Sequence, residues 1–355
     1  MQASPTARSS RTFAAALLKT ATFVQKASHQ AMQLAGVVRP YAMRRTVSLM
    51  RRRANSLLLG APSRLEIGTD CAAPRPKPRL CLLTCLWQRP ELSHVVLQYY
   101  RDIRGTLADV ELDLVAIGSE GSASRQIAEA NDFHYFEHAN SPLSAKWNFG
   151  LQQTRQFHPD GVVLVGSDDL LSAGILNHYA RCLHQGDLFV GFLDGCFLDL
   201  GTSSLCQWHG YAGPKWRARR MAETIGMGRL LARPLLEALD FSLWDGQKAD
   251  SRLDQLAQPK LARLGMLPVL YEHKLPVRCG EHTFHFGQLG LQSDSVPGCL
   301  LDIKTATCIT PFARYTAVEG TCTNIEEPWS HLGRFFPAKT VSALQAMACC
   351  EASPN

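Results

Sequence analysis

The sequence predicts an α/β protein in which helices flank a mostly parallel sheet. From Leu80 onward, short apolar runs of strand length alternate with segments whose apolar residues recur at helical spacing. Strands that alternate with helices across short connections favour a parallel, doubly wound sheet. The composition, 46% hydrophobic and 19% charged over 355 residues, is that of a mostly globular chain, long enough for one large domain or two modest ones.

The expected elements follow one another closely as far as residue 165. The apolar strand at 80–86 is followed by a helix that begins near Pro90, a residue well suited to a first helical turn. The next strand ends in the small polar turn Gly118–Ser122. We expect strands at 80–86, 110–117, 134–136 and 161–165, and helices at 91–103, 124–131 and 146–156.

The alternation weakens after Asp169. Residues 188–193 and 196–200 resemble two strands that meet in a hairpin near Asp194. Residues 227–239 have the apolar spacing of a helix, although Pro234 should break it or start a second helix. No periodic element is evident after about residue 316. The predicted organisation is therefore an N-terminal extension at 1–78, a globular domain at 79–315 and a C-terminal tail at 316–355.

The N-terminal extension is strongly basic. Residues 1–65 contain eleven Lys or Arg and no Asp or Glu, so the net charge of +6 leaves +6 − 11 = −5 for residues 66–355. An acid-free, amphipathic segment of this kind can lie on an anionic membrane surface. A transit peptide, an incorrectly assigned translation start, a non-specific nucleic-acid contact and a disordered tail are the alternatives. The proline-rich stretch Cys71–Arg79 is a linker.

Twelve cysteines are scattered through the chain without a CxxC pair, and several lie inside apolar runs. This pattern favours buried thiols in a reducing compartment and argues against a zinc site. The sequence contains no run of eighteen apolar residues that would cross a membrane. We therefore expect a cytoplasmic protein, which would contact the cytoplasmic face of a membrane through its basic extension alone.

The stretch Gly161–Leu171 carries the strongest signal of chemistry. Its apolar first half predicts a buried strand, and the adjacent residues Asp168 and Asp169 follow where this apolar run ends. Ligands bind outside the carboxyl ends of strands in open α/β sheets, and a divalent cation that carries phosphate oxygens is a common partner for paired carboxylates. The alternative is that Ser167, Asp168 and Asp169 cap a helix that begins near Leu170.

Four pieces of the sequence, in order, resemble the nucleotide-sugar-dependent glycosyltransferases of the GT-A fold, especially the inverting family 2 type. They extend over roughly residues 79–315. The last piece is similar to the DxD-type metal motif of that family. The pieces are Arg89–Pro90, Gly118–Ser122, Lys146–Leu151 and Ser167–Asp169.

The resemblance implies a donor site that depends on Mn²⁺ or Mg²⁺. Asp169 would be the direct metal ligand and Asp168 would contact the ribose or the water shell of the metal, although these two roles could be exchanged. Glu120 would recognise the nucleoside, but it stands where many members have paired aspartates. Lys146 would add a charge near the phosphates or be a surface lysine, and Asn148 would contact the nucleoside or satisfy a backbone group.

The acceptor side implied by the resemblance follows residue 223. Asp245 is our candidate for the general base, because its aromatic neighbour could raise its pKa and stack on a sugar. Asp250 is the second candidate, with a helix cap as its alternative, and Asp254 is expected at a helix surface. His285 would be a third metal ligand. Asp302 and Lys304 would form an ion pair or reach the diphosphate.

These residues predict a metal-dependent glycosyltransferase, inverting by resemblance, that moves a sugar from a nucleotide-sugar donor to a glycan or lipid-linked acceptor. A sugar-phosphate nucleotidyltransferase is the first alternative, although the loop 83–90 lacks the glycines that such enzymes carry. A non-catalytic protein on the same fold, which binds a membrane or nucleic acid through its extension, is the second. We expect no specific nucleic-acid partner.

Overall fold

The computed structural model describes residues 74–212, 220, 222–244, 248–279, 281–308 and 310–351. The basic segment 1–65 and the candidate base Asp245 lie outside the described residues. Within the described ranges, no helix combines the length and the hydropathy that a membrane crossing requires.

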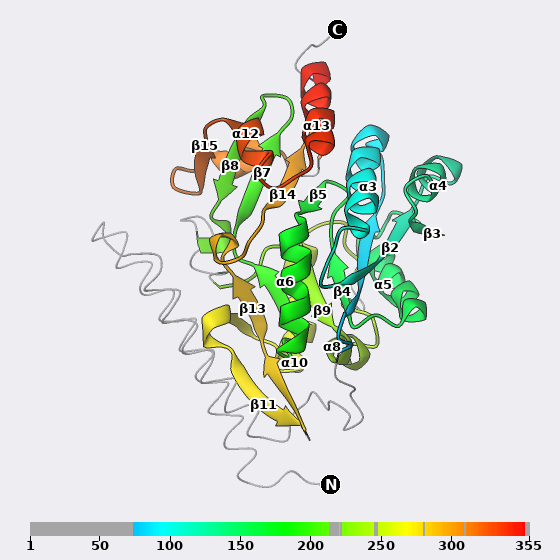
Figure 1. Ribbon diagram of the computed structural model, residues 1–355, viewed down its shortest axis with the longest axis vertical. Helices are drawn as coiled ribbons and strands as arrows, with labels where there is room; N and C mark the ends of the chain where they lie inside the picture. The colour runs from blue at the N-terminus through cyan, green and yellow to red at the C-terminus, as the bar shows by residue number, and fades with distance from the viewer. Residues whose placement is uncertain are drawn as a thin grey trace, which may run out of the picture.

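The larger sheet joins eight of the described strands in the order β10-β13-β6-β9-β4-β1-β2-β3 (Figure 1). Neighbouring strands are parallel except where β9 pairs with β4 and β6. This arrangement confirms the predicted mostly parallel α/β sheet. The strands are β1 (Arg79–Cys85), β2 (Glu111–Gly118), β3 (His134–Glu137), β4 (Gly161–Leu164), β6 (Phe189–Phe192), β9 (Arg229–Ala232), β10 (Pro268–Leu270) and β13 (Gln288–Leu291).

The helices flank this sheet, and its central strands are therefore buried on both faces. Leu80, Leu82 and Leu83 of β1 are 0% exposed, as expected for a parallel strand between two helical layers. The helices are α3 (Pro90–Arg104), α4 (Ser122–Glu129), α5 (Leu143–Thr154), α6 (Ala173–His184), α8 (Arg233–Ala238), α9 (Leu253–Leu256), α10 (Gln258–Arg263), α11 (Ala313–Thr316), α12 (Pro328–Leu332) and α13 (Ala338–Glu351), with short 3-10 turns at Arg155–Phe157, Gly210–Ala212, Tyr271–His273 and Ser293–Ser295.

The order of the larger sheet reverses at β1. The chain leaves β1 toward β2 and β3 and later returns to the other side of β1 with β4. Ligands bind at such a point in open parallel sheets, outside the carboxyl ends of the strands. The loops that follow these ends, 86–89 after β1 and 165–168 after β4, therefore face the same crevice.

A smaller sheet, in the order β15-β8-β7-β14-β5, lies above the central strands of the larger one in Figure 1. Its strand β14 is antiparallel to β5 and parallel to β7. The strands are β5 (Asp169–Leu171), β7 (Gly195–Asp199), β8 (Ser204–Trp208), β14 (Leu300–Lys304) and β15 (Cys322–Ile325), and a separate hairpin joins β11 (Leu275–Cys279) to β12 (His282–Phe286).

Two local expectations for the middle of the chain are wrong. Strands β6 and β7 do not form a hairpin near Asp194, because β6 belongs to the larger sheet and β7 to the smaller one. Residues 229–232 form the antiparallel strand β9 and not the first turns of a helix, although a helix, α8, does begin beside Pro234, as one of the two expectations for that proline had it. Strands β6 and β9 are buried along their whole length, and such burial removes the alternation that would distinguish strand from helix.

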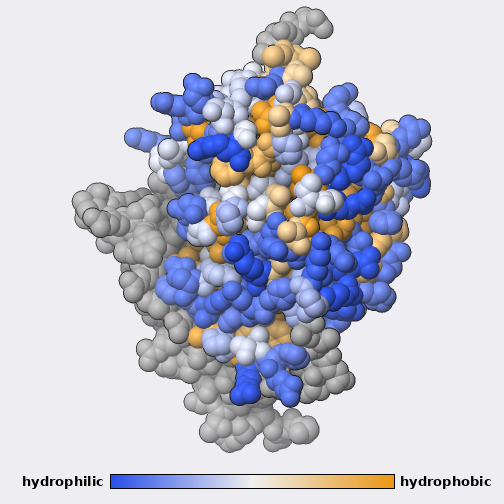
Figure 2. All heavy atoms as spheres, in the orientation of Figure 1, coloured by the Kyte–Doolittle hydropathy of each residue, from blue (hydrophilic) through white to orange (hydrophobic). Residues whose placement is uncertain are grey.

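The expectation of a C-terminal tail without regular structure is also wrong. β15 pairs with β8, and α13 stands beside α3 at the top of Figure 1. The ring of Phe336, just before α13, lies 5.6 Å from that of Tyr99 on α3. The buried positions of α13 are few and include small residues, so its periodicity in the sequence is weak. Hydrophilic residues, coloured blue, predominate on the face drawn in Figure 2. Light orange, more hydrophobic residues lie at the top of this view, where Figure 1 places α13.

Candidate active site

The two adjacent aspartates lie where β4 passes into β5. Asp169 is the first residue of β5, and its Oδ2 accepts a hydrogen bond of 2.6 Å from the backbone N–H of Gly166. A Cβ on Gly166 would stand 2.6 Å from Oδ1 of Asp168 and 2.9 Å from Oδ2 of Asp169, so a side chain there would displace both carboxylates. Because α6 begins at Ala173 and Asp169 belongs to a strand, the helix-cap alternative for Ser167–Asp169 is wrong.

Helix α3 holds the short strand β5 from behind. The hydroxyl of Tyr100 donates to the carbonyl of Asp169 at 3.0 Å and accepts from the N–H of Leu171 at 2.9 Å. The hydroxyl of Tyr99 donates to the carbonyl of Leu171 at 2.8 Å. Both tyrosines are buried, so these contacts fix the backbone that presents Asp169.

Arg89 reaches the aspartates from the other side of the crevice. It ends the loop after β1 with a left-handed φ of 54° and precedes Pro90, the first residue of α3. Its guanidinium donates to Oδ2 of Asp168 at 2.7 Å and to the hydroxyl of Ser167 at 3.0 Å. The reversal of strand order at β1 thus places the positively charged guanidinium of Arg89 beside the carboxylate of Asp168.

A third carboxylate joins the site from β14. The register sets Asp302 opposite Asp169, and the N–H of Ile303 donates to the carbonyl of Asp168 at 2.8 Å. Nζ of Lys304 lies 2.7 Å from Oδ2 of Asp302. Within the part of the chain that the structure describes, Oδ1 of Asp302 is buried and has no hydrogen-bond partner.

The three aspartates have different affinities for a proton. Burial opposes the ionisation of Asp168, but the charges of Arg89 and Lys304 outweigh it and hold the pKa of Asp168 below its ordinary value. Burial, together with repulsion by Asp302 and Asp168, raises the pKa of Asp169 well above the ordinary range. Burial raises the pKa of Asp302 to about 6 despite the attraction of Lys304.

The donor set fits a hard divalent cation. One oxygen from each of Asp168, Asp169 and Asp302 can be chosen so that all lie within 4.8 Å of one another. Carboxylate oxygens are the ligands of Mg²⁺ and suit Mn²⁺ equally. A cation there would meet the unpartnered oxygen of Asp302 and relieve the repulsion that raises two of the three pKa values.

The aspartates open into a pocket of about 560 Å³, within the size range of small-molecule sites. Its wall combines the charged groups with several large aromatic side chains. Arg220 also lies on the wall and stacks 3.5 Å above the ring of Tyr211. The aromatic residues that line the pocket are Trp87, Trp147, Phe197, Trp208, Tyr211 and Tyr315.

The predicted donor residues lie next to the pocket, around the loop after β1. Lys146 is fully buried, and its Nζ donates to the carbonyl of Leu86 at 2.5 Å and to Oδ1 of Asn140 at 3.1 Å. Burial lowers the pKa of Lys146. Glu120 accepts from the N–H of Gln88 at 3.0 Å. Of the described residues, Gln88 and Asn140 line the pocket, whereas Lys146 and Glu120 do not.

Asn148 has the backbone role that the sequence left open as an alternative. Its Oδ1 accepts hydrogen bonds from the N–H groups of Leu243, at 2.8 Å, and Trp244, at 3.0 Å. It therefore joins α5 to the segment that leads to Asp245. Like Lys146, Asn148 lies outside the lining of the pocket.

The acceptor-side carboxylates occupy different positions. Asp250 is exposed and accepts from the N–H of Leu143 at 2.8 Å, at the start of α5, and from the hydroxyl of Ser141. Asp254 lines the pocket, where Tyr211 and Arg220 donate to its Oδ2, so it is not the surface residue that the sequence suggested. Burial opposes the ionisation of Asp254, but Arg229 and Arg220 hold its pKa below the ordinary value.

The structure does not bring His285 together with the aspartates. His285 lies on β12, and its Nδ1 is 2.8 Å from Oδ1 of the buried Asp187. Lys274 and Tyr271 bind the same carboxylate. His285 is absent from the described lining of the pocket and from the three-carboxylate group.

Asp302 and Lys304 were considered from sequence as an ion pair, and they do pair, but the place of Asp302 beside Asp168 and Asp169 was missed. The signal in the sequence is a polar residue at alternate positions of a strand, Asp302 and Lys304, between apolar neighbours. That alternation shows that the two side chains share a face. It does not show which strand lies beside them, because β5 is a hundred or more residues away in the chain.

The stabilisation that Mn²⁺ confers should grow with pH through about 6. The folded chain keeps protons on Asp169 and Asp302 that the unfolded chain has released, because the ordinary pKa is 3.8, so the free energy of unfolding of the metal-free protein falls as pH rises from 3.8 through about 6. A cation competes with these protons. The melting temperature is measured with and without Mn²⁺ at about pH 5 and about pH 7.5. An equal increase at both values would contradict the metal assignment, and Asp302→Asn should weaken the dependence.

The comparisons with known proteins concern the fold. No protein-family model matches the chain, and no curated protein matches it either. Among solved structures, the mannosyltransferase PcManGT from Pyrobaculum calidifontis, in complex with GDP-Man and Mn²⁺, is 14% identical with a TM-score of 0.43; the match covers 94% of this chain and 85% of that one.

Two further solved structures are similar to smaller parts of the chain. One, described as a nucleotide-diphospho-sugar transferase from Desulfovibrio desulfuricans G20, is 13% identical with a TM-score of 0.38, over 77% of this chain and 97% of that one. The other, a cytidylyltransferase from Leptospira borgpetersenii, is 15% identical with a TM-score of 0.31, over 54% and 71%.

Proposed function

We propose that the protein is a metal-dependent glycosyltransferase that moves a sugar, with inversion, from a nucleotide-sugar donor to a glycan or lipid-linked acceptor. The observation that carries the proposal is the convergence of Asp168, Asp169 and Asp302 beside Arg89, at the point where the strand order reverses. Clustered carboxylates next to the cationic side chains of Arg89 and Lys304 suit a metal diphosphate better than they suit an uncharged ligand.

Asp168, Asp169 and Asp302 would hold the cation, with the unpartnered Oδ1 of Asp302 as one ligand atom. When bound, Mn²⁺ or Mg²⁺ would supply Lewis-acid stabilisation of the diphosphate leaving group. Arg89 and Lys304 are now paired with two of these carboxylates. Because guanidinium and ammonium groups bind phosphate oxygens as readily as carboxylate oxygens, both can turn toward the diphosphate once the carboxylates ligate the metal.

The nucleoside end of the donor would lie along the loop after β1. Glu120 holds the N–H of Gln88, and Lys146 holds the carbonyl of Leu86, so both residues shape this loop. We propose that Lys146 acts on the donor by positioning the loop, and that the exposed carboxylate of Glu120 is available to the ribose or base. Asn148 connects the same helix to the acceptor side through its bonds to residues 243 and 244.

The acceptor would enter along the aromatic wall of the pocket. Flat aromatic faces suit the apolar faces of sugar rings, and Trp87 is 41% exposed there. Asp245 remains the proposed general base, with Asp250 as the second candidate. The low pKa of Asp254 and its bonds to Arg220 and Tyr211 make it an organiser of this wall and a poor acceptor of protons.

The test is a panel of nucleoside-diphosphate sugars assayed with Mn²⁺, an acceptor mixture and the full-length protein. We expect release of the nucleoside diphosphate, dependence on the metal and a product whose anomeric centre is inverted, read by proton NMR. Release of pyrophosphate from a nucleoside triphosphate and a sugar phosphate would instead establish a nucleotidyltransferase. In the same assay Asp245→Asn should slow transfer without weakening donor binding; if Asp250→Asn alone does so, the base is Asp250.

A further inference from the structure

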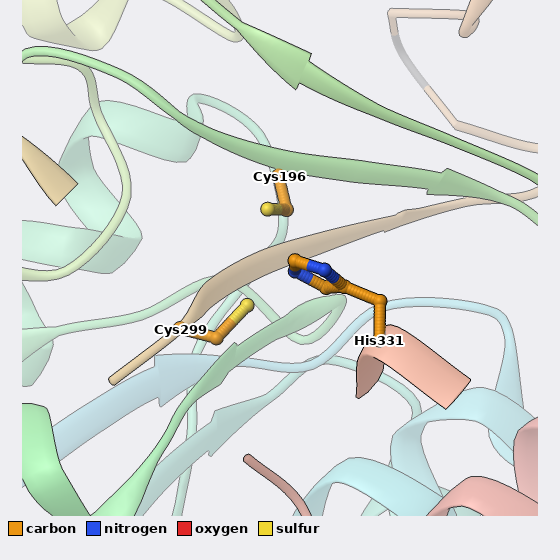
Figure 3. A group of neighbouring side chains, drawn as sticks. All are labelled: Cys196, Cys299 and His331. Atoms are coloured by element: carbon orange, nitrogen blue, oxygen red, sulfur yellow. The ribbon is translucent and has the colours of Figure 1, made fainter. Parts of the chain in front are cut away.

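A second group of metal-binding side chains lies on the smaller sheet, apart from the pocket. Cys196 is on β7, Cys299 directly precedes β14, and His331 is on α12. One ligand atom from each can be chosen so that all three lie within 4.8 Å of one another. Figure 3 shows the imidazole of His331 directed between the two sulfur atoms. None of the three residues belongs to the described lining of the pocket.

We propose that Cys196, Cys299 and His331 bind a divalent cation of the zinc type. Thiolate sulfur and imidazole nitrogen are the ligands that such borderline-soft cations prefer, whereas the carboxylates of the pocket select hard ones. Two thiolates balance the charge of the cation, and both thiols would release their protons to solvent on binding. The protein would then hold two metals of different chemistry.

Burial supports this assignment over a chance contact. Cys196 is 6% exposed and Cys299 is 4% exposed, so a metal between them is shielded from water, while the half-buried His331 leaves a path for its entry. Tetrahedral coordination needs a fourth ligand. Oε1 of Gln207, which lies 3.1 Å from the sulfur of Cys196, or a water that enters beside His331 can occupy that position.

The side chain that must move on binding is Arg334. Its guanidinium donates to Nδ1 of His331, and a ligating neutral imidazole either uses Nδ1 for the metal or carries its proton there. In both cases Arg334 must release His331, which its exposed position allows. Removing this cation, as in Arg334→Ala, should therefore tighten metal binding.

The cation would join three parts of the chain that meet near the active site. Cys196 pairs in register with Leu301 of β14. Ser172, just before α6, accepts a hydrogen bond from the N–H of Cys299 through its hydroxyl and donates its own N–H to the carbonyl of Cys299. Strand β14 carries Asp302 and Lys304 only a few residues beyond Cys299. The second metal would thus fix the strand that supplies the third carboxylate of the pocket, and would fasten α12 to it.

The experiment measures zinc by mass spectrometry in the purified full-length protein after dialysis against excess Zn²⁺ and then against metal-free buffer. We expect about one firmly held equivalent, lost in Cys196→Ser and in His331→Ala. It should be retained in Cys279→Ser, a half-buried cysteine on β11, and in Asp169→Asn, which removes the other site. Loading with Co²⁺ should give a thiolate-to-cobalt charge-transfer band, which carboxylates cannot produce.

Two results would overturn the proposal. One is a wild-type protein that neither retains zinc nor shows the thiolate-to-cobalt band. A disulfide between Cys196 and Cys299, found by mass spectrometry after purification with a reductant, would count as the same result. The other is a band that persists in both Cys196→Ser and Cys299→Ser. Should a cysteine variant fail to fold, His331→Ala and the wild-type cobalt spectrum still decide, because His331 is partly exposed and its loss removes less packing.

Discussion

Replacing Asp169 with asparagine is expected to lower the metal-dependent turnover of a nucleotide sugar by about a hundredfold or more, since a metal ligand in such a site supplies several kcal/mol of transition-state stabilisation. Asparagine keeps the shape of the side chain and can accept the hydrogen bond from the N–H of Gly166. Because burial and two neighbouring carboxylates raise the pKa of Asp169, the ionised group destabilises the metal-free fold, so the melting temperature should stay the same or rise.

Asp109→Asn is the matched control, because Asp109 is exposed and does not line the pocket. It should retain wild-type turnover and the wild-type increase of melting temperature with Mn²⁺. Full turnover in Asp169→Asn with a chelator present would exclude the metal mechanism. A large fall in its melting temperature would instead show that Asp169 has a structural role that we have not assigned.

Replacing Arg89 with methionine should raise the KM for the donor strongly and also destabilise the fold. The change leaves Asp168 without its partner, and both side chains are mostly buried, at 17% and 19% exposed. We expect a loss of about 1–3 kcal/mol, below the figure for a fully buried pair because some solvent screens the charges. The paired Asp168 has a lowered pKa, so this stabilisation is present above pH 3.8, its ordinary value, and is lost as pH falls further.

The second variant, Arg89→Met with Asp168→Asn, separates the two effects. Removing the unpaired carboxylate should restore most of the stability, because no buried charge then lacks a partner. It should not restore donor binding, which needs the guanidinium. Arg263→Met, at an exposed position on α10, is the control for loss of a positive charge alone. Wild-type donor affinity in Arg89→Met would rule out a contact between Arg89 and the diphosphate.

The half of the fold before residue 165 could be predicted because each element there keeps its own pattern. Strand β1 is apolar apart from Arg79 and Thr84, and α3 has Pro90 in its first turn and a buried face that follows the helical period. The second half was harder for a physical reason. Strand β9 is buried in the middle of the sheet, and α8 follows it directly in the chain with the buried residues Leu235 and Leu236, so neither the strand period nor the helix period is evident in the sequence.

In the candidate site, the strand end that carries Asp168 and Asp169 could be located from the sequence, since an apolar run that stops at two carboxylates is a local feature. Asp302 could not be added to it. Its proximity to Asp169 depends on the antiparallel register of β14 with β5, and register between distant strands is set by packing of the whole sheet. The family resemblance singled out Lys146 and Asn148. Their hydrogen-bond partners at residues 86 and 243 could not be predicted, because these partners are distant in the sequence.

By itself, therefore, the sequence determined the α/β class, the apolar strand that is followed by Asp168 and Asp169, and the charge contrast between a basic extension and an acidic remainder, because each depends on neighbouring residues. Only the tertiary structure decided that Arg89, Asp302 and Lys304 surround those two aspartates. It alone also brought Cys196, Cys299 and His331 together, although the spacing of the cysteines argued against zinc. Contacts between remote segments depend on strand order and register, and neither can be predicted from the pattern of neighbouring residues in the sequence.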